Sequence, residues 1–337
     1  MEFLKIIIQL VKSLLIPGPI DSVCPLDPPP SSVFLANLSN TQLILLVIGC
    51  LLTLIIFVLA IVQWAHVWNF VSSEKRQNIL YFFILVLPIS ASCCLIGMFV
   101  PRSAIVLTSF GILYYLICMF MLAVLIRHLN EGRQNLVDYL KLNRRLINLQ
   151  SAPFCYFMCF LPQLEPTEKY LRILEWMVLQ APIIRALIVI SNVAAVSDYR
   201  ESARYWFHWS DIGSIASPMI AVFGLHTLAR LSGEKLSKFC FMRIFRMIDM
   251  AFFIFSCQIL VFDNIFVRFE YFKCGPILSP VDSSKFVCNF VIICEMLFIS
   301  MVASLMITPK ECELFDKFKK EDDSGENDVE DPNEDTL

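Results

Sequence analysis

Two ionisable side chains fall deep inside apolar runs of the chain, where a charge is costly. Arg185 lies near the middle of one run and Glu295 lies inside another. Because a charge in hydrocarbon is expensive, such residues usually face the interior of a helix bundle or a water-filled cavity. They can pair with each other, or Arg185 can attract an amphipathic anion. Asn192 and Gln258 are further candidates for substrate contact, or for hydrogen bonds between helices.

The remaining reactive residues form no catalytic pattern. The sequence holds no G-x-x-x-x-G-K-[ST] nucleotide loop, no H-E-x-x-H and no G-x-S-x-G, and its 13 cysteines include no C-x-x-C pair. We therefore predict neither an enzyme nor an ATP-driven pump, and no cofactor or metal. His226 is expected to serve helix packing. Asp249 and Asp263 lie near the ends of one run, and each is expected to snorkel or to pair with an arginine: Arg243, Arg246 or Arg268.

The composition predicts that membrane-spanning helices position these residues. Of the 337 residues 57% are hydrophobic and 17% are charged, whereas soluble domains carry about 25% charged residues. An apolar run of about 20 residues crosses hydrocarbon as a helix, because a helix pairs its own backbone amides. Seven such runs predict an all-α, seven-helix transmembrane bundle: 43–62, 79–100, 103–126, 173–196, 212–228, 247–266 and 286–308. The fifth is the shortest. Three of the runs contain a proline that predicts a kink: Pro88, Pro182 and Pro218.

The distribution of charge predicts an outer amino terminus and a cytoplasmic carboxy terminus. In that orientation the inner segments hold 18 Lys and Arg residues and the outer segments hold 8, as the positive-inside rule requires. Asn37 begins an N-glycosylation sequon that is usable only on the outer side. The chain then divides into an extracellular segment (1–41), a seven-span domain (42–308) and an acidic cytoplasmic tail (309–337) that is expected to be disordered. Residues 1–16 predict an interfacial helix, with a cleaved signal peptide as the alternative.

Cysteines close to the membrane surfaces are candidate modification sites. Cys155 and Cys159 lie in a short apolar segment of the long inner loop, where S-palmitoylation is a candidate modification. On the outer side Cys274 and Cys288 stand 14 residues apart. A disulfide between these two is a candidate in an oxidising compartment, with Cys24 as a rival partner.

Four short segments, in this order, carry a resemblance to a known family: PRS at 101–103, PFCYFMCFLP at 153–162, LSGE at 231–234 followed by KF at 238–239, and CGP at 274–276 followed by SS at 283–284 and Cys288. Together they resemble the alpha subunit of the organic solute transporter (the organic solute transporter alpha / transmembrane 184 family) over about residues 42–308. By position, Arg185 matches a basic residue of that family and Glu295 its acidic residue in the last span. Cys155 and Cys159 match a cysteine cluster that is denser in transporting members.

The resemblance implies a passive carrier without a cofactor. Members of the family look like seven-helix proteins that work with a single-span beta subunit and move bile acids, steroid conjugates and related amphipathic anions by facilitated diffusion. The implied partners are amphipathic anionic small molecules, membrane lipids and a beta-type subunit, with a homo-oligomer left open and no nucleic acid. The implied location is the plasma membrane, with internal vesicles or the endoplasmic reticulum as alternatives. Some relatives are linked to membrane trafficking.

Two other functional classes fit parts of the sequence. A seven-helix receptor coupled to a cytoplasmic signalling partner has the same topology. Against it, the third run ends without an acidic-Arg-aromatic triplet and the seventh lacks an Asn-Pro-x-x-Tyr motif. An intramembrane hydrolase needs clustered His, Asp or Ser side chains, which the sequence does not reveal. The carrier is therefore the favoured hypothesis.

Overall fold

The computed structural model is helical and describes residues 28–151, 153–154, 163–199, 203–267, 269, 271–275, 277–309 and 312–318. Its long helices are α3 (Asn40–Phe70), α4 (Glu74–Phe99), α5 (Ala104–Leu129), α7 (Glu168–Tyr199), α8 (Ala203–Ser232), α9 (Phe241–Val261) and α10 (Pro280–Met306). The short ones are α2 (Ser31–Ala36), η1 (Pro101–Ser103), α6 (Arg133–Leu142), η2 (Ser237–Phe239) and the π-helical η3 (Phe262–Phe266). Within the described residues, seven helices are long and apolar enough to cross a membrane. The predicted all-α fold with seven spans is confirmed.

The spanning helices extend beyond most of the apolar runs that predicted them. Helix α3 begins at a capping box, in which the Ser39 hydroxyl accepts a hydrogen bond from the Gln42 amide at 3.3 Å. The Gln42 side chain accepts one from the Ser39 amide at 3.0 Å. The fifth span, predicted as 212–228, is the 30-residue helix α8. A helix satisfies its backbone whether its side chains are apolar or polar, so its ends outrun the hydrophobic pattern.

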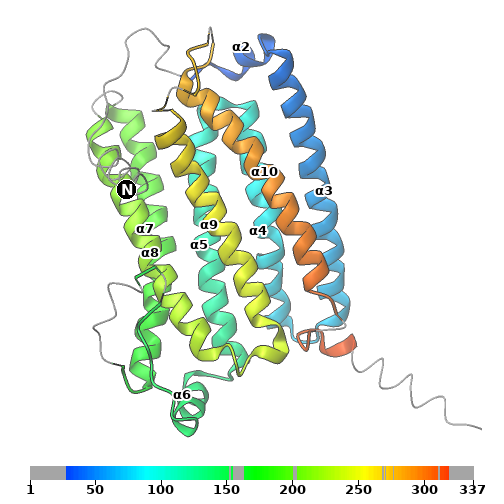
Figure 1. Cartoon of the computed structure of the whole chain (residues 1–337), viewed down its shortest axis with the longest axis vertical. Helices are drawn as coiled ribbons and strands as arrows, with labels where there is room; N and C mark the ends of the chain where they lie inside the picture. Colours follow the sequence, from blue (N-terminus) through cyan, green and yellow to red (C-terminus); the bar gives the residue numbers. More distant parts are fainter. Residues whose placement is uncertain are drawn as a thin grey trace, which may run out of the picture.

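Helix α5 lies at the centre of the bundle and separates two groups of helices (Figure 1). Its Tyr115, Leu116, Met119 and Leu122 side chains are fully buried. Helices α3, α4 and α10 pack against one another, and α4 packs on α5; we call these three the first half. Helix α8 packs along α7, and α7 also packs on α5; we call this pair the second half. Helix α9 contacts both α5 and α10.

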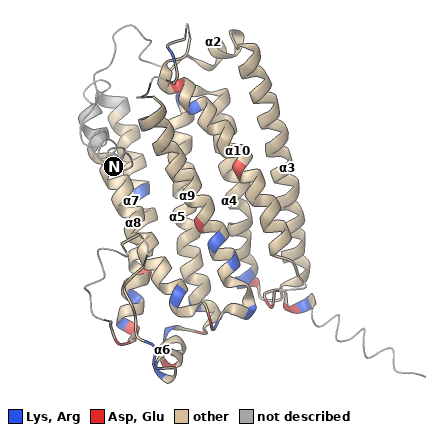
Figure 2. Ribbon diagram, viewed as in Figure 1, with Lys and Arg blue, Asp and Glu red and all other residues tan. Residues whose placement is uncertain are grey.

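Charged side chains are concentrated at one end of the bundle. Figure 2 shows most Lys and Arg residues toward the end that carries α6, and few toward the end that carries α2. Following the predicted orientation, we call the α6 end the inner end and the α2 end the outer end. Asn37 is exposed beside α2 at the outer end, so its glycosylation stays a prediction that this position allows.

The three span prolines lie inside continuous helices. Pro88 is in α4, Pro182 in α7 and Pro218 in α8. Close to two of them, Gln180 and Ser217 join α7 to α8 through a pair of hydrogen bonds. The Gln180 amide donates to the Ser217 carbonyl oxygen at 3.0 Å, and the Ser217 hydroxyl donates to the Gln180 Oε1 at 2.9 Å. Bonds of this kind help hold helices together in lipid.

The beginning of the acidic tail packs against the bundle. Residues 312–318, which we call the strap, lie across the inner end, and Leu314 and Phe315 are buried there. The sequence predicted disorder for the whole of 309–337, and for the strap this expectation is wrong. A charge count missed the two apolar side chains because acidic residues surround them.

Candidate functional site

Arg185 projects from α7 toward α5. Its side chain is buried, with 8% of the residue exposed, and its Nη2 donates a hydrogen bond to the Ser109 hydroxyl at 3.2 Å. Ser109 belongs to α5 and lies 76 residues away in the chain, so the contact depends on the packing of the two helices. The structure therefore confirms a buried cation at this point of the bundle.

An apolar groove begins one helical turn from this contact. It has a volume of about 470 Å³ and is lined by α5 and α7 through these residues: Leu113, Ile117, Phe120, Leu179, Pro182, Ile183, Ala186 and Leu187. Ser109, Leu113 and Ile117 are spaced four residues apart and so share one face of α5. Pockets that hold small molecules have volumes of roughly 300–1,000 Å³, and this groove is within that range.

The groove opens sideways from the bundle. Ile183 is 50% exposed and Leu187 is 62% exposed, and apolar side chains exposed on a spanning helix face lipid. Arg185 does not line the groove itself, but it follows the lining residue Pro182 by three positions and contacts Ser109, one turn from Leu113, so a buried cation lies next to the edge of an apolar surface. Such a combination suits a molecule with an apolar body and an anionic group.

Asn192 extends the polar face of α7 toward the outer end. It follows Arg185 by seven residues, which is two helical turns and about 10 Å along the axis. Positions seven apart share a face of a helix, and the Asn192 Oδ1 atom is buried without a hydrogen-bond partner. Arg185 and Asn192 thus share one face of α7.

Glu295 and Gln258 form a separate polar contact. The Gln258 amide of α9 donates to Glu295 Oε1 of α10 at 2.9 Å. The second carboxylate oxygen of Glu295, Oε2, and the amide oxygen of Gln258, Oε1, are buried without a hydrogen-bond partner. Glu295 is therefore paired with Gln258 and not with Arg185, which answers the first alternative from the sequence. The four predicted residues divide into two places in the bundle.

A histidine–aspartate pair between α8 and α9 was not predicted. His226 Nε2 lies 3.3 Å from Asp249 Oδ2, and its Nδ1 lies 3.0 Å from the Val222 carbonyl oxygen. A carbonyl oxygen can only accept, so Nδ1 is the donor in the contact with Val222, and Nε2 faces the Asp249 carboxyl group. Asp249 thus pairs with His226, a partner that neither of the two alternatives from the sequence, snorkelling or an arginine, had named. The side chain of Asp263 lies outside the described residues.

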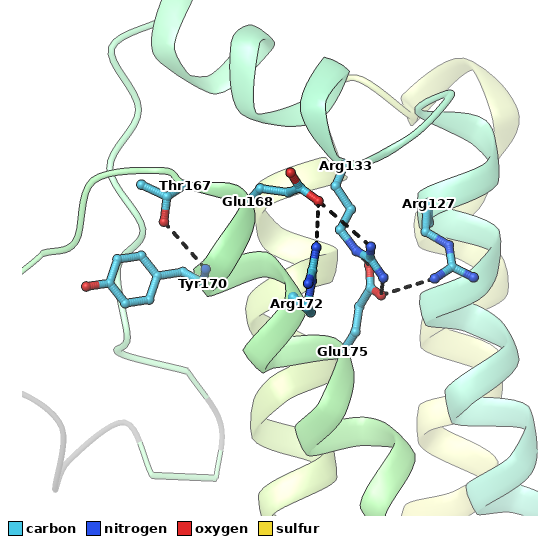
Figure 3. A network of polar contacts seen from close by, with 7 residues as sticks. All are labelled: Arg127, Arg133, Thr167, Glu168, Tyr170, Arg172 and Glu175. Atoms are coloured by element: carbon cyan, nitrogen blue, oxygen red, sulfur yellow. Dashed lines mark hydrogen bonds and ion pairs between the residues drawn. The ribbon is translucent and has the colours of Figure 1, made fainter.

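An ion-pair network joins α5, α6 and α7 at the inner end (Figure 3). Arg133 contacts both oxygens of Glu175, at 3.0 and 2.7 Å, and Arg127 donates to the same carboxylate at 3.3 Å. Hydrogen bonding to Glu175 raises the pKa of Arg133. In the turns of α7 before Glu175, Arg172 donates a hydrogen bond to Glu168 at 3.0 Å. The network fixes the inner end of α7 and thereby the helix that carries Arg185.

The cysteine predictions have different outcomes. Cys274 is disulfide-bonded, but Cys288 is a buried thiol of α10, so the predicted bond between these two is not formed. Cys288 sits inside a helix that packs against α4, which turns its side chain away from the outer loop. Cys24, the rival partner, lies outside the described residues, as do Cys155, Cys159 and the predicted interfacial helix at 1–16.

Comparison with known proteins points to one family. A family model described as "Organic solute transporter Ostalpha" matches residues 45–311. The organic solute transporter alpha-like protein 3 of Caenorhabditis elegans is 42% identical over 294 residues, which cover 87% of this chain and 84% of that protein. Alpha-like protein 1 of the same organism is 30% identical over 300 residues, with coverages of 87% and 76%. No solved structure matches the chain. Among the described residues, no group of three His, Cys, Asp or Glu side chains is placed to hold a metal ion.

Proposed function

The chain belongs to the organic solute transporter Ostalpha family, and from this premise we propose that it carries amphipathic organic anions by facilitated diffusion. Membership makes it a multi-pass membrane solute transporter. The finer proposal is that the solutes are steroid conjugates or bile-acid-like molecules, which combine a rigid apolar body with one anionic group.

The observation that supports this proposal is the buried Arg185 at the edge of the α5–α7 groove. The apolar body of the solute lies along Leu113 and Ile183, where it replaces lipid. Its sulfate or carboxylate meets Arg185, whose planar guanidinium can donate two parallel hydrogen bonds to either group. Asn192 offers the next polar contact toward the outer end.

Glu295 and Gln258 receive a different role in this proposal. A carboxylate repels an anion, and Glu295 is engaged with the Gln258 amide. We assign this pair to the joining of α9 to α10 and keep Arg185 and Asn192 as substrate contacts. Family membership favours a carrier over the seven-helix receptor, because the relatives are named as solute transporters.

The family name also implies a partner subunit. We propose a single-span beta-type subunit as this partner, because the family is named for an alpha subunit. We propose the plasma membrane as the site of transport, with a contribution to trafficking on internal vesicles as an additional role.

The test is uptake and efflux of a radiolabelled sulfated steroid in cells that express the chain with and without a single-span partner. We expect bidirectional flux down the gradient. Arg185→Ala should reduce the flux about tenfold or more, since a charged hydrogen bond contributes about 1.5–3 kcal/mol. Arg172→Ala is the matched control, because Arg172 is an exposed arginine on the same helix and should leave flux unchanged. Wild-type protein that reaches the cell surface with its partner and moves no steroid would overturn the proposal.

A further inference from the structure

The strap closes the inner end of the first half and of α9. Cys312 and Leu314 have no exposed surface, and Phe315 is 3% exposed. Leu314 and Phe315 line an apolar cavity of about 70 Å³ together with residues of α3, α4, α9 and α10. The strap is thus one wall of this cavity, and without it the cavity would open toward the inner side.

Polar contacts hold the strap to the turn between α3 and α4. Asp316 accepts a hydrogen bond from the Ser72 amide at 2.9 Å and another from the Ser72 hydroxyl, and Arg76 lies 3.5 Å from the same carboxylate. Phe318 packs edge-on against Phe70, with ring centroids 5.1 Å apart. These contacts anchor the carboxy-terminal end of the strap.

A disulfide holds the other end. Cys312 is bonded to Cys240, which stands 72 residues earlier at the start of α9. Beside it the Glu313 amide donates to the Lys238 carbonyl oxygen at 3.2 Å. Both sulfurs are buried, with Cys240 5% and Cys312 0% exposed. A thiol from solution therefore reaches this bond only when the strap lifts.

We infer that Cys240 and Cys312 form a redox modification site, at which exchange with a low-molecular-weight thiol such as glutathione releases the strap from the bundle. The charge bias predicts that this end faces the cytoplasm. Disulfides are rare there, and those that do occur are usually transient and redox-sensing. The bond thus differs from that of Cys274, which lies at the outer end.

The exchange is balanced in atoms and electrons. A glutathione thiolate attacks one sulfur of the protein disulfide and forms a mixed disulfide, and the other protein sulfur leaves as a thiolate that takes up a proton. A second glutathione then attacks the mixed disulfide. Two protein thiols and one glutathione disulfide result, with two electrons transferred to the protein. Glutathione disulfide drives the reverse reaction.

The contacts of Asp316 control the rate of this exchange. Since the sulfurs are covered while the strap is docked, the rate follows the population of the lifted state. Loss of the Asp316 carboxylate raises that population, so Asp316→Ala should be reduced by glutathione about tenfold faster than the wild type. Ser72→Ala, which removes one donor, should give a smaller increase. Lys317→Ala is the matched control, because Lys317 is an exposed residue of the same strap.

The test uses the full-length chain in lipid nanodiscs after mild oxidation with glutathione disulfide. Free thiols are first alkylated with light N-ethylmaleimide. Glutathione is then added, the thiols that it releases are alkylated with heavy N-ethylmaleimide, and both labels are measured by mass spectrometry. We expect a linked peptide that contains Cys240 and Cys312. The rate of its reduction should be fastest in Asp316→Ala, slower in Ser72→Ala and slowest in the wild type. Hydrogen exchange of residues 312–318 should be faster after reduction than before. Absence of the linked peptide, equal rates in all variants, or unchanged exchange after reduction would each overturn the inference.

The proposed transport is tested separately from the strap. None of these readouts requires a moving solute, so a chain that fails in the uptake experiment can still show the exchange. A chain that transports the steroid while its Cys240 and Cys312 stay unlinked would retain the proposed function and lose the redox site.

Discussion

The two halves of the bundle are both closely packed, and they differ in what they leave open. In the first half, α3, α4 and α10 pack closely, and α4 buries twelve of its residues. In the second half, α7 and α8 are joined by the Gln180–Ser217 bonds and a close approach at Gly224, and α7 leaves its apolar groove open. The comparison suggests that the first half supplies a rigid frame and the second half the binding surface.

The difference has a physical cause. Lipid tails are as apolar as leucine side chains, so hydrophobic burial alone does not bring helices together in a membrane. Close packing and polar contacts do so instead. In the second half both act between α7 and α8, through the close approach at Gly224 and the Gln180–Ser217 bonds, and the groove between α5 and α7 stays open.

The largest effect is expected from Glu175→Ala. This change leaves Arg127 and Arg133 without their shared carboxylate at the inner end of the second half. We expect a loss of about 2–3 kcal/mol of unfolding free energy, somewhat below the range for fully buried pairs. Glu168→Ala, at a side chain that is 45% exposed, is the control and should cost less than about 0.5 kcal/mol. Thermal unfolding in detergent measures both losses of unfolding free energy. A loss in Glu175→Ala as small as that in Glu168→Ala would show that the network does not hold α7.

A pair of glycine substitutions compares the two halves directly. A Cβ at Gly224 would meet the Leu174 carbonyl oxygen at 3.0 Å, whereas at Gly49 of α3 the nearest atom would be 3.5 Å away on Leu95. Gly224→Ala should therefore cost about 1–2 kcal/mol through crowding. Gly49→Ala should be neutral or stabilise by up to about 1 kcal/mol through helix propensity. The unfolding midpoints of the two variants decide the matter, and a stabilising Gly224→Ala would contradict tight packing of α7 on α8.

A smaller effect is expected from the bonds between α7 and α8. A double-mutant cycle with Gln180→Leu and Ser217→Ala should give a coupling energy of about 0.6 kcal/mol, the average for hydrogen bonds between membrane helices. Unfolding free energies of the two single variants and the double variant provide the measurement. A coupling of zero would mean that the two side chains stabilise the pair independently.

The smallest effect concerns pH at the inner end of the first half. Burial alone would raise the pKa of Asp316, but the hydrogen bonds from Ser72 and the charge of Arg76 outweigh it, so the pKa lies below its ordinary value. A depressed pKa contributes stability that is present above the unfolded value of about 3.9 and is lost as pH falls through the folded value. Protection of residues 312–318 against hydrogen exchange, relative to an unfolded chain at the same pH, should therefore be high at neutral pH. The part of this protection that Asp316 contributes should be lost only in acid. Asp316→Asn should abolish this pH dependence, and a strap that loosens between pH 6 and 8 would contradict the assignment.

The sequence predicted the number of spans because hydropathy depends on composition within each run. It also placed Arg185 and Glu295 at depth, since a charge inside an apolar run is visible without a structure. Their partners were not predictable. Ser109 and Gln258 lie 76 and 37 residues away from them, and only the packing of the helices brings these side chains together.

The cysteines and the tail show the limits of local patterns. The spacing of Cys274 and Cys288 suggested a bond, but the helical phase of α10 buries Cys288 in the bundle. The pairing of Cys240 with Cys312 joins two segments that the sequence had assigned to a loop and to a disordered tail. Neither pairing could be read from the residues around it.

In the proposed function an amphipathic anion binds between α5 and α7 with its charge at Arg185. The most direct measurement is cross-linking with a photoactivatable steroid sulfate on the wild-type chain and on Arg185→Ala, followed by peptide mapping. We expect labelling within residues 113–120 and 179–187 that unlabelled steroid sulfate competes away. This labelling should fall about tenfold in Arg185→Ala but not in Arg172→Ala. Labelling confined to the first half, or unchanged in Arg185→Ala, would contradict it.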